Sequence, residues 1–141
     1  MDANKRIQKW IENGDETAVL NLFGLNIGEL PELPLNLQNL NCYLCPIGKL
    51  PKLPTSLLVL NCSNCPNLKE LPELPESLQI LQCSSCSKLK ELPKLPESLQ
   101  ILNYSNCTIQ KYRNYLNHYK YYIVPIAPLK NYQNYRNRCK Y

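Results

Sequence analysis

Three pairs of cysteines are the residues of this sequence that are best suited to chemistry. Each pair has the form Cys-x-x-Cys, and 16 and 17 residues separate the successive pairs, which are Cys42 and Cys45, Cys62 and Cys65, and Cys83 and Cys86. As thiolates, cysteines at such a spacing can bind zinc in a tetrahedral site like that of a zinc ribbon. Zinc binding is therefore one hypothesis, which depends on the elements that position these cysteines.

The cysteines belong to a longer repeat. Residues 30–109 hold four copies of one unit, whose first residues are 20 or 21 positions apart: Leu30, Leu50, Leu71 and Leu92. Each copy contains the pattern Leu-x-x-Leu-x-Cys-x-x-Cys or a close variant, which in the second copy is formed by Leu57, Leu60, Cys62 and Cys65. A fixed short period predicts a solenoid of stacked units and not a globular core.

The spacing within a copy predicts a short strand. A period of two places Leu60 and Cys62 on one face of the strand, and Asn61 and Ser63 on the other. Successive copies then form a parallel sheet with strands roughly 4.8 Å apart. Every copy also carries two prolines three residues apart, which excludes a regular helix on the return path and favours an extended, polyproline-like segment.

These motifs resemble leucine-rich repeat proteins, specifically the short Leu-Pro-x-Leu-Pro subtype of bacterial type III secreted effectors and giant-virus proteins. The resemblance is dense over residues 30–109 and loose in the flanks. It implies an α/β solenoid, a short horseshoe with a parallel concave sheet, an extended convex side and helical caps at both ends. Some effectors of this kind attach a ubiquitin ligase domain after the repeats, and we find no counterpart of that large helical domain among the 141 residues.

The chain divides into three parts. Residues 1–29 should form a capping helix over Ala3 to Asn13, ended by Gly14, and a degenerate copy over Val19 to Ile27. Residues 30–110 hold the four repeats. Residues 111–141 should form a second capping helix, from Tyr112 to Ile123, followed by a basic tail rich in Tyr and Asn.

The repeat offers a second interpretation of the cysteines. Seven of the eight lie at repeat positions that point inward, where apolar or aromatic residues replace them in other copies: Leu22, Leu25 and Tyr104. A core tolerates such replacement and a set of metal ligands does not, so we interpret the cysteines as reduced core residues and expect no metal and no cofactor. The one histidine, His118, gives no thiol a nearby base, and we therefore expect no enzymatic activity.

Charge suggests a different class of function for the C-terminal part. The net charge is +5, and residues 111–141 contribute +7 because they hold seven basic and no acidic residues, so the remainder is 5 minus 7, or −2. Eight of the ten tyrosines also lie there. Binding of RNA or single-stranded DNA by charge and stacking is thus an alternative function, although Asn, Tyr and Lys are also common in chains encoded by AT-rich genomes.

The concave sheet face is the main candidate site. Its outward positions form uncharged columns of amide, hydroxyl and apolar side chains, which suit another protein better than they suit phosphate. We expect a protein partner to bind Tyr43, Val59, Asn61, Ser63, Ile80, Gln82, Ser84, Ile101 and Asn103. Because the sequence contains no apolar run long enough to span a bilayer and no apolar leader, we expect a protein of the cytosol without membrane contact. The resemblance implies that this could be the cytosol of an infected host cell. We also expect a monomer.

Overall fold

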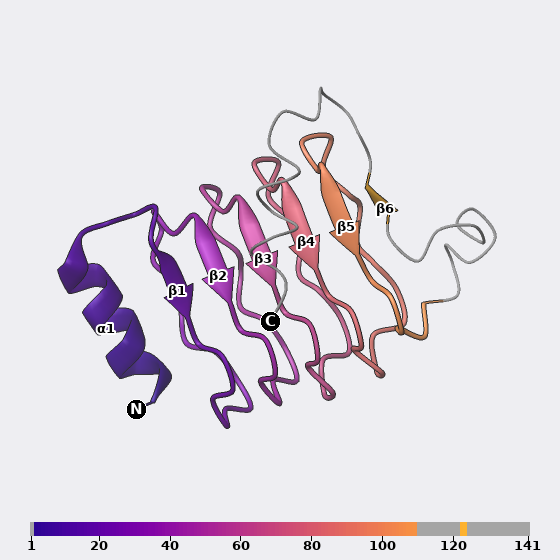
Figure 1. Cartoon of the computed structure of the whole chain (residues 1–141), viewed down its shortest axis with the longest axis horizontal. Helices are drawn as coiled ribbons and strands as arrows, with labels where there is room; N and C mark the ends of the chain where they lie inside the picture. The colour runs from indigo at the N-terminus through magenta and orange to yellow at the C-terminus, as the bar shows by residue number, and fades with distance from the viewer. Residues whose placement is uncertain (1, 110–121, 124–141) are drawn as a thin grey trace.

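The computed structural model describes residues 2–109 and 122–123 and shows a β-solenoid that begins with a helix (Figure 1). The elements follow one another along the array in chain order, each strand beside the previous one. They are α1 (Ala3–Asn13), β1 (Val19–Asn21), β2 (Asn39–Asn41), β3 (Val59–Asn61), β4 (Ile80–Gln82), β5 (Ile101–Asn103) and β6 (Tyr122–Ile123). β1 to β5 are parallel, so the predicted solenoid with a parallel sheet is confirmed.

From β1 to β5, each strand pairs with the equivalent strand of the next copy, residue for residue. Leu40 of β2 pairs with Leu60 of β3, which pairs with Leu81 of β4. The hydrogen bonds continue beyond the three-residue strands, since Cys42 N–H donates to the Asn61 carbonyl at 2.8 Å. Equivalent residues of all copies therefore lie in straight columns.

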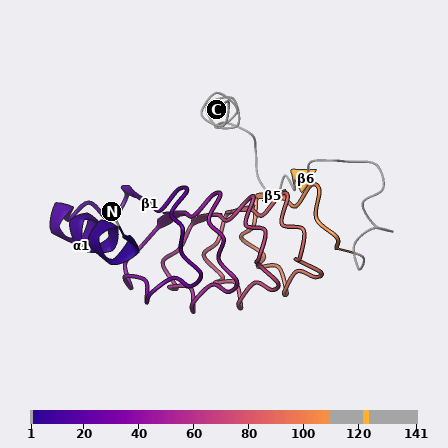
Figure 2. The same cartoon turned by 90° about the horizontal axis from the view of Figure 1, so that it is seen from below.

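The return path between strands is extended, as the prolines predict. Between β1 and β5 the chain contains turns and no helix (Figure 2). A serine in each of three copies binds this path to the preceding copy: Ser56 donates to the carbonyls of Leu35 and Leu37, Ser77 to that of Leu57, and Ser98 to that of Leu78. These bonds satisfy backbone acceptors that no helix or sheet could pair.

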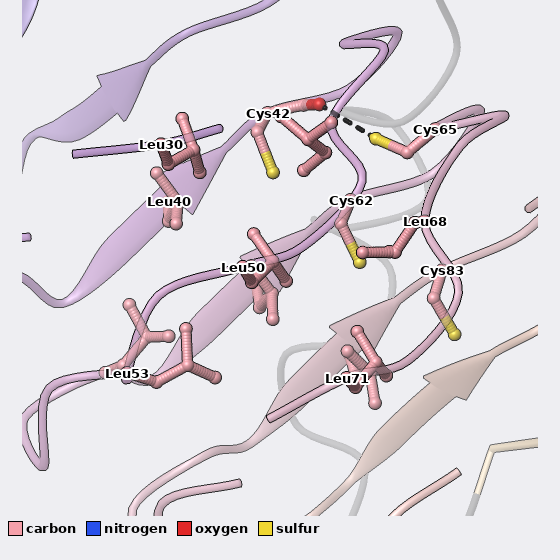
Figure 3. Close-up of a cluster of buried hydrophobic side chains, with 14 of the residues drawn as sticks. Leu30, Leu40, Cys42, Leu50, Leu53, Cys62, Cys65, Leu68, Leu71 and Cys83 are labelled. Atoms are coloured by element: carbon pink, nitrogen blue, oxygen red, sulfur yellow. Dashed lines mark hydrogen bonds between the residues drawn. The ribbon is translucent and has the colours of Figure 1, made fainter. Parts of the chain in front are cut away.

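The core lies between the sheet and the return path. The inward leucines and cysteines of the second copy are 0 % exposed: Leu57, Leu60, Cys62, Cys65 and Leu68. Figure 3 shows the same columns of leucine side chains and sulfur atoms running from one copy to the next. The degenerate copy joins this core through buried Leu20 and Leu22 and partly buried Leu25 and Ile27, as expected.

α1 covers the first edge of the sheet. The Asp2 side chain accepts a hydrogen bond from Lys5 N–H at the start of the helix, and Gly14 ends it with φ of 69°. Ala3, Ile7 and Trp10 are buried, whereas Ile11 is 50 % exposed. Trp10 Nε1 donates to the Ala18 carbonyl at 2.9 Å, and an Arg6 guanidinium N–H donates to the Asn21 carbonyl at 2.9 Å. The helix thus satisfies carbonyl groups of the edge that it covers.

The C-terminal prediction needs a correction. The capping helix predicted for Tyr112 to Ile123 lies largely outside the described residues, as does the basic tail. At Tyr122 and Ile123 the prediction is wrong, because these residues form β6, antiparallel to β5. The physical reason is the open edge of β5, whose backbone groups need partners that a strand provides and a helix does not.

Nowhere in the described part of the chain is there a helix with the length and apolar character that crossing a membrane requires.

Candidate interaction surface on the sheet

The side of the sheet away from the core carries three columns of side chains, which we call the open sheet face. The first column is Val19, Asn39, Val59, Ile80 and Ile101, and the second is Asn21, Asn41, Asn61, Gln82 and Asn103. The third, just past the strands, is Phe23, Tyr43, Ser63, Ser84 and Ser105, aligned by further backbone hydrogen bonds. None of these fifteen residues is charged.

The structure brings the nine predicted site residues together on this face but leaves them less accessible than we expected. Ser63 and Ile80 are buried, with 5 % and 6 % exposure. The other seven are half-buried: Tyr43, Val59, Asn61, Gln82, Ser84, Ile101 and Asn103. A period of two predicts the direction of a side chain, whereas its exposure also depends on the neighbours in adjacent copies.

The asparagine column has a structural function in addition to its place on the surface. Asn61 Oδ1 accepts a hydrogen bond from Ser63 N–H at 3.1 Å, and Asn41 and Asn103 do the same for the residues two positions on. Asn41 also donates through Nδ2 to Asn21 Oδ1 at 3.2 Å. These side-chain oxygens hold the turn that ends each strand. The recurrence of Asn therefore has a conformational cause, and a partner is not needed to explain it.

The most exposed apolar residues of the face lie at its N-terminal end and were missed by the sequence prediction. The rings of Phe23 and Tyr43 stack, with centroids 5.6 Å apart and planes 4° from parallel. Phe23 is 48 % exposed, Val19 55 % and the neighbouring Leu44 51 %. The signal for Val19 and Phe23 was present, because extending the columns into the degenerate copy places both of them outward. We call Val19, Phe23, Tyr43 and Leu44 the aromatic patch.

The second cysteine of each pair forms hydrogen bonds inside the core. The thiol of Cys86 donates to the Cys62 carbonyl in the preceding copy at 3.2 Å. Cys107, which has the same place in the fourth copy but no cysteine before it, donates to the Cys83 carbonyl at 2.9 Å. Cys45 donates in the same way to the Leu22 carbonyl at 3.0 Å. Because each thiol proton is donated to a carbonyl oxygen, the backbone fixes the position of the sulfur atom.

The pKa values of the thiols are high for physical reasons. Burial raises the pKa of Cys62 and of Cys83 well above the ordinary value. Hydrogen bonding to Cys42, together with burial, raises the pKa of Cys65 to about 12. For Cys86, hydrogen bonding to Cys107 lowers the pKa while hydrogen bonding to Cys65 and burial raise it, and the pKa is about 11.

Metal binding and nucleophilic attack both require a thiolate. The seven described cysteines are free thiols, and all of them lie in or against the core. Among the described residues, no three His, Cys, Asp or Glu side chains are grouped as a metal would require. The Cys-x-x-Cys pairs thus lie in the core as free thiols. His118 and Cys139 lie outside the described residues.

Comparison with other proteins adds no relative: no protein-family model matches the chain, and neither does any curated protein.

Proposed function

We propose that this chain is a non-enzymatic protein–protein interaction module that binds its partner through the open sheet face, with the aromatic patch at the centre of the contact. The observation that carries the proposal is the exposed Phe23 ring stacked on half-buried Tyr43, on a surface without charge. Exposed aromatic side chains are the residues that most often dominate binding energy between proteins. The surrounding amides of Asn39 and Asn41 supply polar groups that orient a partner.

The rest of the sheet favours recognition through side chains. Both edges are occupied, since α1 packs against β1 and β6 pairs with β5. Addition of a partner strand to an edge is therefore disfavoured, and the flat face between the edges remains. A solenoid commonly uses such an extended face for binding.

Paired serine substitutions test the proposal. In the full-length chain, Phe23→Ser and Tyr43→Ser introduce the residue that the same column already contains at Ser63 and Ser84, so the fold should persist. Tagged wild type and variant are used to capture partners from a eukaryotic cell lysate with and without RNase, and the retained partner is then purified and titrated. We expect the double variant to lose at least about 30-fold in affinity, as loss of a binding hot spot does.

The matched control is Leu35→Thr. Leu35 is 87 % exposed, lies outside the open sheet face, and is replaced by Thr55 at the same position of the next copy. This variant should bind as tightly as wild type. If the double serine variant also binds as tightly while its circular dichroism is unchanged, the aromatic patch is not the site.

A second candidate function rests on the composition of residues 111–141, whose charge of +7 and eight tyrosines suit single-stranded nucleic acid. Capture that depends on these residues and disappears with RNase would favour this alternative.

We also propose that the chain is a leucine-rich repeat protein of the short effector-like subtype and acts in a cytosol. The buried thiols support a reducing compartment, because oxidation would remove their hydrogen bonds.

A further inference from the structure

Four charged side chains alternate in sign along the return path. They hold the same place in each of the four repeats, two positions after the first leucine, and all of them are exposed: Glu32, Lys52, Glu73 and Lys94. We call them the charged column. The return paths are aligned on both sides of it, since Glu29 is the bridge partner of Lys49 before the column and Ser77 donates to the Leu57 carbonyl at 2.7 Å after it. The four charges therefore follow one another in chain order across the array.

The order of these charges makes the column complementary to itself. From the first repeat to the fourth the signs are minus, plus, minus and plus, so the column read in reverse carries the opposite sign at every position. A twofold axis across the column, between the second and third repeats, places two such columns against each other in opposite directions. Each glutamate then faces a lysine of the partner subunit, and each lysine faces a glutamate.

We propose that two copies of this chain associate through their charged columns as a twofold-symmetric dimer. Glu32 faces Lys94 of the partner subunit, and Lys52 faces Glu73 of the partner subunit. Two columns aligned in the same direction would instead bring like charges together, which disfavours that arrangement. The sequence led us to expect a monomer, and this dimer departs from that expectation.

The dimer goes beyond the partner binding proposed above and does not depend on it. Because the core lies between the sheet and the return path, a contact through the charged column leaves the open sheet face free. One dimer would then present two open sheet faces, one on each of its outer sides.

The rows beside the charged column are compatible with this pairing. In the row after it, reversal places Glu76 opposite Thr55 of the partner subunit and Glu97 opposite Leu35 of the partner subunit, so like charges do not meet there. The row before the column has no net charge, because its three acidic and three basic residues balance: Glu29, Lys49, Lys69, Glu70, Lys90 and Glu91.

The charged column is also available for contacts with a second chain. None of its four side chains forms a hydrogen bond or an ion pair with another residue in the part of the chain that the structure describes. Each of them follows a half-buried proline, whose ring restricts the backbone, so less conformational entropy is lost when the charge is paired. Exposed ion pairs contribute only about 0–1 kcal/mol each, so the dimer should be weak and sensitive to salt.

Sedimentation velocity on the full-length chain tests the proposal, over a series of protein concentrations and at two salt concentrations. We expect a concentration-dependent dimer that weakens when salt is raised from about 0.01 M to about 1 M, because the screening length falls from roughly 30 Å to roughly 3 Å. A wild type that is monomeric at the highest concentration and the lowest salt would overturn the proposal, and so would a dimer that does not respond to salt.

Two double variants separate contacts between chains from contacts within one chain. The 32/94 exchange carries Glu32→Lys and Lys94→Glu, and the 32/52 exchange carries Glu32→Lys and Lys52→Glu. Both keep the composition and the net charge of wild type. In the 32/94 exchange the signs become plus, plus, minus and minus, which still reverse into their opposites, so the dimer should persist. In the 32/52 exchange they become plus, minus, minus and plus, so every charge would face its like and the dimer should weaken at least about tenfold.

Attraction between neighbouring repeats of one chain makes the opposite prediction. The 32/94 exchange keeps one of the three opposite-charge neighbours in the column, whereas the 32/52 exchange keeps two of them. If the charges serve only the register of the repeats, the 32/94 exchange should be the more disturbed variant, and thermal denaturation followed by circular dichroism measures this. Equal self-association of the two variants would place the contact elsewhere on the chain and would equally overturn the proposal.

Discussion

The thiol of Cys65 donates a hydrogen bond to the carbonyl oxygen of Cys42, one copy earlier, across 3.3 Å (Figure 3). The Cys42 carbonyl lies just past β2, and this thiol is its donor among the described residues. A buried carbonyl that loses its donor destabilises a fold by roughly 1–3 kcal/mol. The second cysteine of each pair is thus a backbone partner. Of the first cysteines, Cys42 donates to the Asn61 carbonyl at 3.4 Å, and Cys62 fills space.

Replacing the two kinds of cysteine by alanine should separate these roles. Cys65→Ala removes both volume and the bond to Cys42, whereas Cys62→Ala removes the same volume from a site that is also 0 % exposed and whose thiol makes no hydrogen bond to the described residues. We expect Cys65→Ala to lower the free energy of unfolding by about 1 kcal/mol more than Cys62→Ala does. Urea denaturation in the presence of a reductant measures the difference. Equal losses would mean that the thiol bond contributes nothing to stability.

Alkaline pH should destabilise the fold. Unfolded thiols lose their protons near pH 9, while the pKa of folded Cys86 is about 11 and that of Cys65 about 12. A folded pKa that is raised means that stability is fully present below pH 9 and is lost as the pH rises toward 11 and 12. The free energy of unfolding should fall by up to about 1.4 kcal/mol per pH unit for each such thiol.

Urea titrations between pH 7 and pH 11 measure this slope. A variant with both Cys65→Ala and Cys86→Ala should show a shallower fall above pH 9, even though it starts from a lower stability. The same slope in wild type and variant would show that other groups cause the alkaline loss.

Leu44 occupies a backbone conformation that leucine disfavours. Its φ is 60°, and the equivalent residues of the other copies, with φ between 55° and 65°, are Gly24, Asn64, Ser85 and Asn106. A left-handed conformation costs roughly 1–2 kcal/mol for a residue with a β-carbon, less for asparagine. Because Leu44 is 51 % exposed, Leu44→Asn should raise the free energy of unfolding by about 1 kcal/mol. The reverse change Asn64→Leu should lower it, and a rise in that variant would contradict the backbone explanation.

Trp10 should stabilise the fold as a hydrogen-bond donor as well as through its buried aromatic ring. Trp10→Phe keeps an aromatic ring but removes the bond from Nε1 to the Ala18 carbonyl, so we expect a loss of about 1–2 kcal/mol. Trp10→Ala should cost about 3–5 kcal/mol, because it also leaves a cavity. Ile11→Ala, on the exposed side of the same helix, is the control and should change stability by less than about 0.5 kcal/mol. Thermal denaturation followed by circular dichroism ranks the three variants.

The sequence predicted the array well because its signals repeat. Leu60 and its equivalents recur at a fixed period, and Gly14 after an apolar helical stripe placed the end of α1 correctly. The element that pairs with the edge of β5 was predicted poorly. The apolar stripe from Tyr112 to Ile123 suits a helix in isolation, and only the unpaired backbone groups at the edge of β5 favour β6. A local sequence pattern carries no information about the unpaired backbone groups of a neighbouring strand.

The candidate site was predicted in position but not in detail. Alternation placed Val59 and Asn61 on the outer face, yet it carried no information on the bond from Ser63 N–H to Asn61 Oδ1 or on the burial of Ile80. Phe23 lies in the degenerate copy, whose repeat pattern indicates its inward residues more clearly than its outward ones. Sequence periodicity predicts the direction of a side chain, whereas the accessibility of that side chain follows from its contacts with neighbouring copies.

The bond from each second cysteine to the copy before it also bears on how such a gene can change. Because the thiols of Cys65, Cys86 and Cys107 each donate to a carbonyl of the preceding copy, the junctions between these copies are built alike. Recombination that inserts or removes the 21 residues from Leu71 to Glu91 would join ends that already fit. The length of the open sheet face can therefore change in a single genetic event, without any new arrangement of the core.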